Sequence, residues 1–178
     1  MPIRIVRLGF VGSLMIAALT YPAAVGGQTV DGPMALDELK QLAGRWEGTT
    51  SSPDVPGSLD VRVIGGGSTV IMTEFPGTPH EMTTLYFLDG DVLRLKHFCS
   101  MGNQPEMELD QAASSVEELR FVFTGGTNLD AGTDMHIHQG TIRLIEADRL
   151  ESSWDMFEGG QLAGTNRFFL SRVASSGS

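Results

Sequence analysis

The chain has 178 residues, of which 41% are hydrophobic and 19% charged, and this composition indicates one folded domain and excludes a disordered protein. Its formal net charge is −10, so it lacks the basic footprint that binding to nucleic acid or to an anionic membrane requires. The only cysteine, Cys99, cannot form an internal disulfide, and the fold must therefore be held by its core.

The N-terminal segment has the three parts of a secretory signal peptide. Arg4 and Arg7 precede an almost wholly apolar run over 8–19, and small residues follow it. We expect cleavage near Gly27-Gln28, which removes residues 1–27 and shifts the formal charge from −10 to −12. The alternative is a retained anchor, although the apolar run is short for a membrane span. We therefore expect an exported protein, periplasmic or extracellular, with no stable membrane anchor after cleavage.

A linker at residues 28–35 leads into the one helix that the sequence predicts. Residues 36–43 place leucines at three-residue intervals, with acidic side chains early and Gly44 at the stop position. We expect a domain over residues 36–172 and a disordered tail at 173–178.

All other segments alternate apolar and polar residues with period two, which is typical of β-strands. An Asp89-Gly90-Asp91 turn joins two of them in a hairpin. The predicted strands lie at 44–49, 59–63, 70–75, 82–88, 92–99, 106–110, 118–123, 136–145, 150–157 and 162–170.

Short turns between these strands favour an antiparallel meander, because parallel neighbours need long crossovers. Closure removes exposed sheet edges. The sequence therefore predicts an all-β protein: a roughly ten-stranded, antiparallel, up-and-down β-barrel with one short N-terminal helix. A β-sandwich is the alternative.

The segment Gly44-Arg45-Trp46-Glu47-Gly48 after a short helix, followed by the meander, resembles the calycin superfamily. It is similar to lipocalins, fatty-acid-binding proteins and the nitrobindin-like bacterial domains. The resemblance implies that Trp46 packs across one end of the barrel. Nitrobindin-like proteins bind haem through a histidine near the C-terminus, and the last predicted strand here has none.

Two strands carry candidate metal ligands. Residues two apart on a strand share a face at about 7 Å, which pairs His97 with Cys99 and His136 with His138. The companions of these pairs are apolar, so we expect both pairs to face the barrel interior. Imidazole and thiolate suit a transition metal or haem iron. The alternative is a set of buried polar groups bonded to one another and to backbone.

The expected inner face also contains bulky aromatic side chains beside small or polar ones. Trp46, Phe121 and Trp154 are such aromatics, and with the two His/Cys pairs they are the candidate ligand-binding residues. We expect His97 and His138 to point into a cavity that opens near a long loop over residues 124–134. Acidic side chains such as Glu106, Glu108, Glu151 and Asp155 are expected on the outer face.

These observations favour a lipocalin-like barrel that binds a small, largely apolar ligand without catalysis and without a required cofactor. One alternative is a metal- or haem-dependent enzyme that uses His97, Cys99, His136 and His138. Another is an interaction module whose barrel is filled by side chains. Neither a catalytic residue nor the oligomeric state is predicted.

Overall fold

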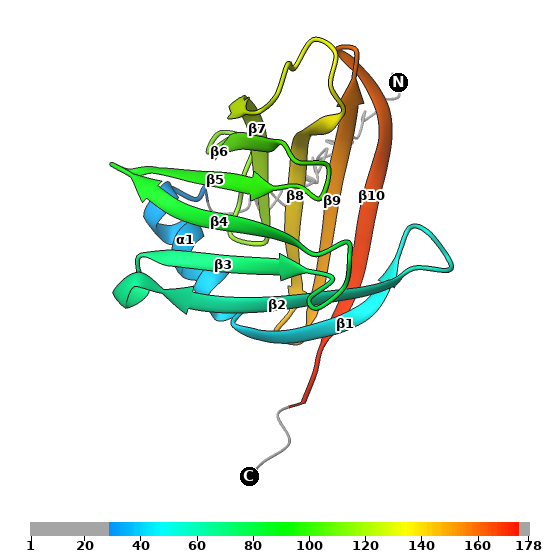
Figure 1. Cartoon of the computed structure of the whole chain (residues 1–178). Coiled ribbons are helices and arrows are strands. Elements are labelled where there is room, and N and C mark those ends of the chain that lie inside the picture. Colours follow the sequence, from blue (N-terminus) through cyan, green and yellow to red (C-terminus); the bar gives the residue numbers. More distant parts are fainter. Residues whose placement is uncertain (1–28, 175–178) are drawn as a thin grey trace, which may run out of the picture.

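The structure is a computed structural model that describes residues 29–174 (Figure 1). The predicted signal peptide at 1–27 and most of the predicted tail at 173–178 lie outside the described residues. The described residues form helix α1 (Gly32–Gln41), a short 3₁₀ turn η1 (Gly65–Gly67) and ten strands. The strands are β1 (Gly44–Thr50), β2 (Pro56–Ile64), β3 (Thr69–Glu74), β4 (Met82–Asp89), β5 (Val92–Phe98), β6 (Gln104–Leu109), β7 (Glu118–Thr127), β8 (His136–Glu146), β9 (Arg149–Glu158) and β10 (Gln161–Arg172).

The ten strands form a closed antiparallel barrel in which each strand pairs with its sequence neighbours and β1 pairs with β10. This confirms the predicted all-β, up-and-down barrel with one short helix. In Figure 1, β2–β5 run across the view and β8–β10 run up it, so the two walls of the barrel cross each other. Since the turns are short and every pair is antiparallel, no crossover connection is needed.

Helix α1 begins at Gly32, four residues before the predicted start, so the predicted linker at 28–35 contains its first turn. The Asp31 side chain caps the helix by accepting a hydrogen bond from the Met34 backbone N–H (2.9 Å), and Pro33 occupies the first turn, where a missing N–H is tolerated. A side chain at Gly32 would overlap the Asp91 carbonyl oxygen, so the helix start packs directly on the β4–β5 hairpin. The leucine spacing alone did not reveal this turn.

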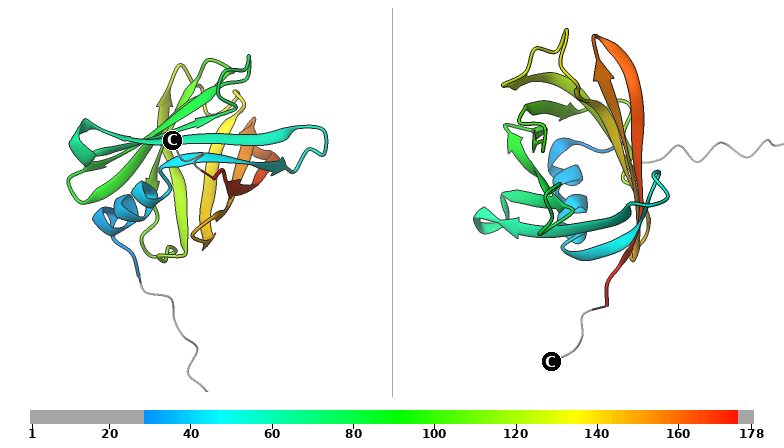
Figure 2. Two further views of the ribbon diagram at one scale, coloured as in Figure 1. Left: turned by 90° about the horizontal axis from the view of Figure 1, so that it is seen from below. Right: turned by 45° about the vertical axis from the view of Figure 1, so that its right-hand side comes forward.

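Helix α1 covers one end of the barrel. Its apolar face buries Ala35, Leu36 and Leu39 in the core. The helix lies against β3, β4 and β5 (Figure 2). At this end of the barrel the odd-numbered strands begin and the even-numbered strands end, because neighbouring strands run in opposite directions. The β1–β2 loop projects at the opposite end (Figure 1).

The Gly-x-Trp-x-Gly segment seals the helix-covered end. Trp46 is 1% exposed and its indole N–H donates to the Leu42 carbonyl oxygen at 2.8 Å. The guanidinium of Arg172 lies 4.3 Å from the indole ring centroid, and it belongs to the last strand. A Cβ at Gly48 would overlap the carbonyl oxygen of Phe169, so this glycine permits β1 and β10 to approach closely. Trp46 therefore packs across one barrel end, as the resemblance implies.

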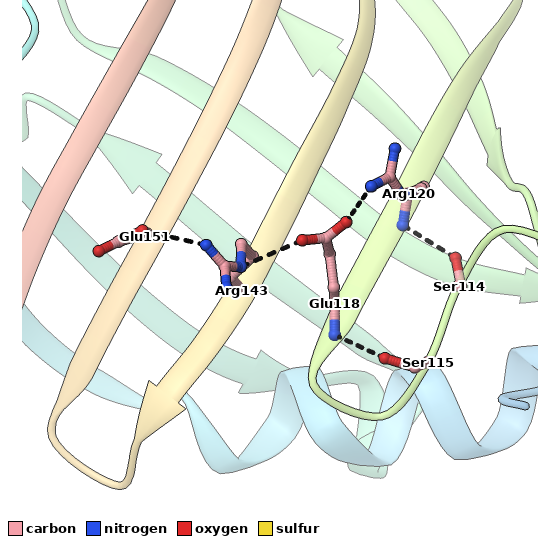
Figure 3. A network of polar contacts seen from close by, with 6 residues as sticks. All are labelled: Ser114, Ser115, Glu118, Arg120, Arg143 and Glu151. Carbon is pink, nitrogen blue, oxygen red and sulfur yellow. Dashed lines mark hydrogen bonds and ion pairs between the residues drawn. The ribbon is translucent and has the colours of Figure 1, made fainter. Parts of the chain in front are cut away.

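The outer face holds cross-strand ion pairs that match the strand register. Arg143 stands opposite both Glu118 on β7 and Glu151 on β9, and its Nε lies 3.1 Å from the Glu118 carboxylate (Figure 3). Arg120 adds a second contact to the same carboxylate. Exposed pairs of this kind contribute less than about 1 kcal/mol each, so they favour one register more than they stabilise the fold. The predicted outward position of Glu151 is confirmed, as are those of Glu106 and Glu108, which pair with Lys96 and Arg94.

Candidate functional site

The barrel contains a cavity of about 220 Å³ at the end opposite α1. Its walls come from the β1–β2 loop, the end of β3, the start of β4, the end of β5, the start of β8, and the middle of β9 and β10. Most of the lining is apolar, with a few polar groups among it. The lining residues are Thr50, Ser52, Val55, Glu74, Phe75, Met82, His97, Cys99, Ile137, Trp154, Met156, Asn166 and Phe168.

Glu74 ends β3 on the inner face, in alternation with the buried Val70 and Met72. It is half-buried, and within residues 29–174 its carboxylate makes no hydrogen bond or ion pair. Burial without a partner disfavours the charged form and raises the pKa of Glu74 from 4.5 to about 7. The carboxyl group therefore changes protonation near neutral pH, within reach of a bound molecule.

His97 lies one layer deeper, opposite Thr84 on β4. The imidazole is 3% exposed, and its Nδ1 lies 2.8 Å from the Thr84 hydroxyl oxygen. Desolvation lowers the pKa of His97 to about 4, so the ring is neutral at neutral pH. Because Nδ1 is bonded to Thr84, Nε2 is the ring nitrogen left for the cavity.

Trp154 forms part of the cavity wall on β9. A Cβ at Gly140, the residue opposite on β8, would overlap the indole ring, so glycine makes the space in which this ring lies flat. The ring stacks on Phe121 (centroids 6.4 Å apart), and Phe121 meets Tyr86 edge-on at 5.6 Å. Phe121 and Tyr86 are 1% exposed and do not line the cavity. They form the packed floor that separates the cavity from the helix-covered end.

The rim is built around an unusual backbone conformation. Phe75 has a φ of 51°, a left-handed value that is rare for a bulky residue. Its carbonyl oxygen accepts hydrogen bonds from both the backbone N–H and the hydroxyl of Thr78, and its ring packs at 5.5 Å from that of Phe168. Such backbone conformations cost on the order of 1–3 kcal/mol and concentrate at binding sites. Here the conformation turns the Phe75 ring toward the cavity.

His136 and His138 lie in a different place. They form a cluster with Phe123 and Phe157, in which the His138 ring lies 4.2 Å from the ring centroid of Phe157 and 4.8 Å from that of Phe123. The His136 Nδ1 donates to the Asp134 carbonyl oxygen at 2.8 Å, and its Nε2 lies 3.1 Å from Nδ1 of His138. Neither imidazole lines the cavity.

A β-bulge accounts for this position. The β8–β9 register shifts between Ile137 and Gln139, which leaves His138 without a partner in the ladder. The inner face of β8 therefore continues from Gly140 to Ile137 and bypasses His138. The period-two pattern carries no sign of this extra residue, and so the expectation that His138 points into the cavity is wrong.

Of the seven candidate ligand-binding residues, three line the cavity: His97, Cys99 and Trp154. Phe121 lies beneath it, Trp46 lies at the other end of the barrel, and the two remaining histidines form the separate cluster. Four converging metal ligands are therefore not present, and residues 29–174 contain no group of three or more His, Cys, Asp or Glu side chains placed to hold a metal ion. Metal or haem binding stays a prediction from the sequence.

The cavity does not open beside the 124–134 loop, none of whose residues line it. Its mouth lies beside the β1–β2 loop and the turn after β3, because the walls there are Ser52, Val55 and Phe75. The sequence does not single out Glu74 as a cavity residue, although Glu74 alternates with the apolar Val70 and Met72. Phe75 lines the cavity because its backbone has a left-handed φ, and no local sequence motif predicts that conformation.

No known family profile matches this chain, and no curated protein matches it in sequence. Its fold is similar to the crystal structure of a protein of unknown function from the DUF3598 family of Nostoc punctiforme PCC 73102 (TM-score 0.51, 13% identity). The match covers 75% of this chain and 48% of the other, so the chain spans about half the length of that protein. At this identity the similarity concerns the fold alone. Fold and cavity together define the class: a closed ten-stranded barrel with an internal site at one end.

Among the helices of residues 29–174, none is both long and apolar enough to span a membrane.

Proposed function

We propose that this protein is an exported, lipocalin-like barrel that binds one small, largely apolar molecule in the cavity and does not transform it. The carrying observation is the cavity itself: about 220 Å³ of space, mostly apolar walls and a few inward polar groups. Small-molecule sites have this composition, since apolar walls supply the affinity and sparse polar groups fix the orientation. Export rests on the charged, apolar and small-residue pattern of residues 1–27.

The filled part of the molecule supports the same conclusion. Leu93, Leu95 and Met107 are almost completely buried, and Leu95 stands opposite both Tyr86 and Met107, so the barrel is filled by side chains at the level of the floor. A filled interaction module would be solid throughout, yet this barrel has space at the other end. The alternative of a metal-dependent enzyme requires four ligands that converge inside the barrel. His97 and Cys99 line the cavity, whereas His136 and His138 lie together outside it.

Native mass spectrometry of the protein, purified under mild conditions from its own cell envelope, tests the proposal. We expect a non-covalent adduct of one small molecule per chain, recovered chemically unchanged. Met156→Trp should abolish the adduct, because Met156 lines the cavity and the larger ring fills it. Met101→Trp is the matched control, since Met101 is exposed and outside the lining. A protein that carries no adduct, or an adduct equally retained in Met156→Trp, would contradict the proposal.

A further inference from the structure

The described cavity wall carries negative charge but no positive charge. Among the described residues that line it, Glu74 is the sole carboxylate and no lysine or arginine is present. An anionic ligand, such as the carboxylate of a fatty acid, would meet no positive partner there and would lie close to Glu74. Two like charges in a poorly solvated space repel each other, so the wall disfavours carboxylic acids as ligands.

Among residues 29–174, Glu74 has no hydrogen-bond or ion-pair partner. Lys96 pairs with Glu106 and Arg94 with Glu108 and Asp89, all on the outer face of β5 and its neighbours. The inward-facing titratable neighbours of Glu74 are uncharged at neutral pH: His97 on β5 is a neutral imidazole, and burial and the nearby Glu74 carboxylate raise the pKa of Tyr86 on β4 well above 10. No cation of the described chain reaches the Glu74 carboxylate, and an unpaired, partly buried carboxylate is costly.

Aromatic rings also line the cavity near Glu74. Phe75, Phe168 and Trp154 line the same cavity, and the Phe75 and Phe168 rings are in contact. The faces of aromatic rings attract organic cations, and this attraction grows when water is excluded. The whole chain is also acidic, with a formal charge of −10, which favours the approach of cations.

We propose that the cavity takes a small apolar amine, bound as its ammonium ion, with the cation paired to the Glu74 carboxylate and the apolar part against the aromatic and methionine side chains. This inference rests on the proposed function, because it specifies the ligand of the same cavity. It differs from a general apolar pocket in a measurable way: among ligands with the same apolar tail, the charge of the head group decides which one binds most tightly.

Three probes with the same tail separate the possibilities: octylamine, n-octanol and octanoate. Calorimetric titration of the whole protein at about pH 8, where Glu74 is ionised, should show octylammonium binding about tenfold more tightly than n-octanol and octanoate binding most weakly. Glu74→Gln should reduce the affinity for octylammonium to about that for n-octanol. The isosteric substitution preserves the strand, which thermal unfolding verifies.

Glu158→Gln is the matched control, because it removes the same charge from an exposed position outside the cavity. It should leave the affinity for octylammonium unchanged, whereas an equal loss in both variants would show a general charge effect and overturn the inference. Equal or tighter binding of octanoate or n-octanol in the wild-type protein would also overturn it while the proposed function stands. Binding of none of the three would overturn the proposed function and the inference together.

Proton release provides an independent readout. An ammonium ion beside Glu74 favours the ionised carboxylate, so octylamine should displace a proton near pH 7 and n-octanol should displace none. Titrations in two buffers of different ionisation enthalpy measure this number. Proton release that persists in Glu74→Gln would contradict the assignment of the carboxylate.

Discussion

Two titratable side chains in the cavity wall affect stability with opposite signs. Folding raises the pKa of Glu74 from 4.5 to about 7, so between these values the folded protein keeps a proton that the unfolded chain releases. The contribution of Glu74 is therefore fully present below pH 4.5 and is lost as the pH rises through about 7. Folding lowers the pKa of His97 from 6.5 to about 4, and its contribution is present above pH 6.5 and lost as the pH falls through about 4. Between pH 4.5 and 6.5 the two slopes oppose each other.

Glu74→Gln should expose this compensation. Relative to the wild-type protein, the free energy of unfolding of the variant should rise by up to about 3 kcal/mol between pH 4.5 and 7, since one pKa unit corresponds to about 1.4 kcal/mol. Urea unfolding at a series of pH values measures the difference. Tyr86, His97 and Cys99 are the other titratable side chains of this interior. They are the same in the wild-type protein and in Glu74→Gln, so the difference between the two proteins reports on Glu74. A difference that is constant with pH would show that the carboxyl group has an ordinary pKa.

Gly140 determines whether Trp154 can form the cavity wall. A Cβ at this position would overlap the indole ring, and overpacking of this kind costs about 1–3 kcal/mol. Gly140→Ala should therefore lower the melting temperature by several degrees and shift the tryptophan emission, because the ring must move. Gly164→Ala is the control, since a Cβ there meets open space. Equal effects of both substitutions would contradict the role of Gly140.

The sequence predicts the position of every strand, but it does not predict for every residue the face of the strand on which the side chain lies. Period-two alternation depends on the pleat, and it placed Leu93, Leu95 and His97 correctly on the buried face of β5. It failed on β8, where one bulged residue displaces His138 from the inner face. A bulge leaves almost no trace in a single sequence, because both flanking segments still alternate. The helix start was missed for a related reason: a cap and a proline, not an apolar repeat, define its first turn.

The bulge makes a prediction about β8. His138→Phe should leave the binding of n-octanol to the cavity unchanged, because the side chain lies between Phe123 and Phe157 and outside the lining. Ile137→Trp, at the neighbouring residue, should abolish that binding because Ile137 lines the cavity. Calorimetric titration of the two variants separates the positions. A loss of binding in His138→Phe at an unchanged melting temperature would mean that the imidazole reaches the ligand.

At the scale of the whole molecule, the closed barrel followed from ten alternating segments and short turns, since closure is the simplest way to leave no exposed edge. The sequence pattern does not show which end of the barrel is open. That choice depends on α1 and Trp46 filling one end, and on Phe75 turning at the other, and these are contacts between segments distant in the sequence. Alternation reports which face of a strand is buried, but not whether side chains or space lie behind it.

Arg172 ties together the segments that meet at the closed end. Its guanidinium donates to the carbonyl oxygens of Gln41 (2.9 Å), Ala43 (2.7 Å) and Ala147 (3.2 Å), while it lies over the Trp46 ring. These groups belong to the helix terminus, the connection to β1, the β8–β9 turn and β1 itself. One side chain at the end of β10 therefore fastens the last strand to the first and to the helix. Hydrogen bonds to a charged group contribute about 1.5–3 kcal/mol, and a cation–π contact adds about 0.5–1 kcal/mol.

Arg172→Ala should lower the free energy of unfolding by about 2–3 kcal/mol and the melting temperature by about 5–10 °C, because the closed end loses the three side-chain hydrogen bonds that Arg172 donates there. Arg172→Lys should recover part of the loss, since an ammonium group keeps the charge but cannot reach three carbonyl oxygens in a fixed fork. Arg62→Ala, at an exposed position on β2, is the control and should change little. The affinity for n-octanol should stay the same in all three variants, because the packed floor of Tyr86 and Phe121 separates the cavity from this end. A variant that loses ligand binding while the barrel remains folded would show that the two ends are coupled.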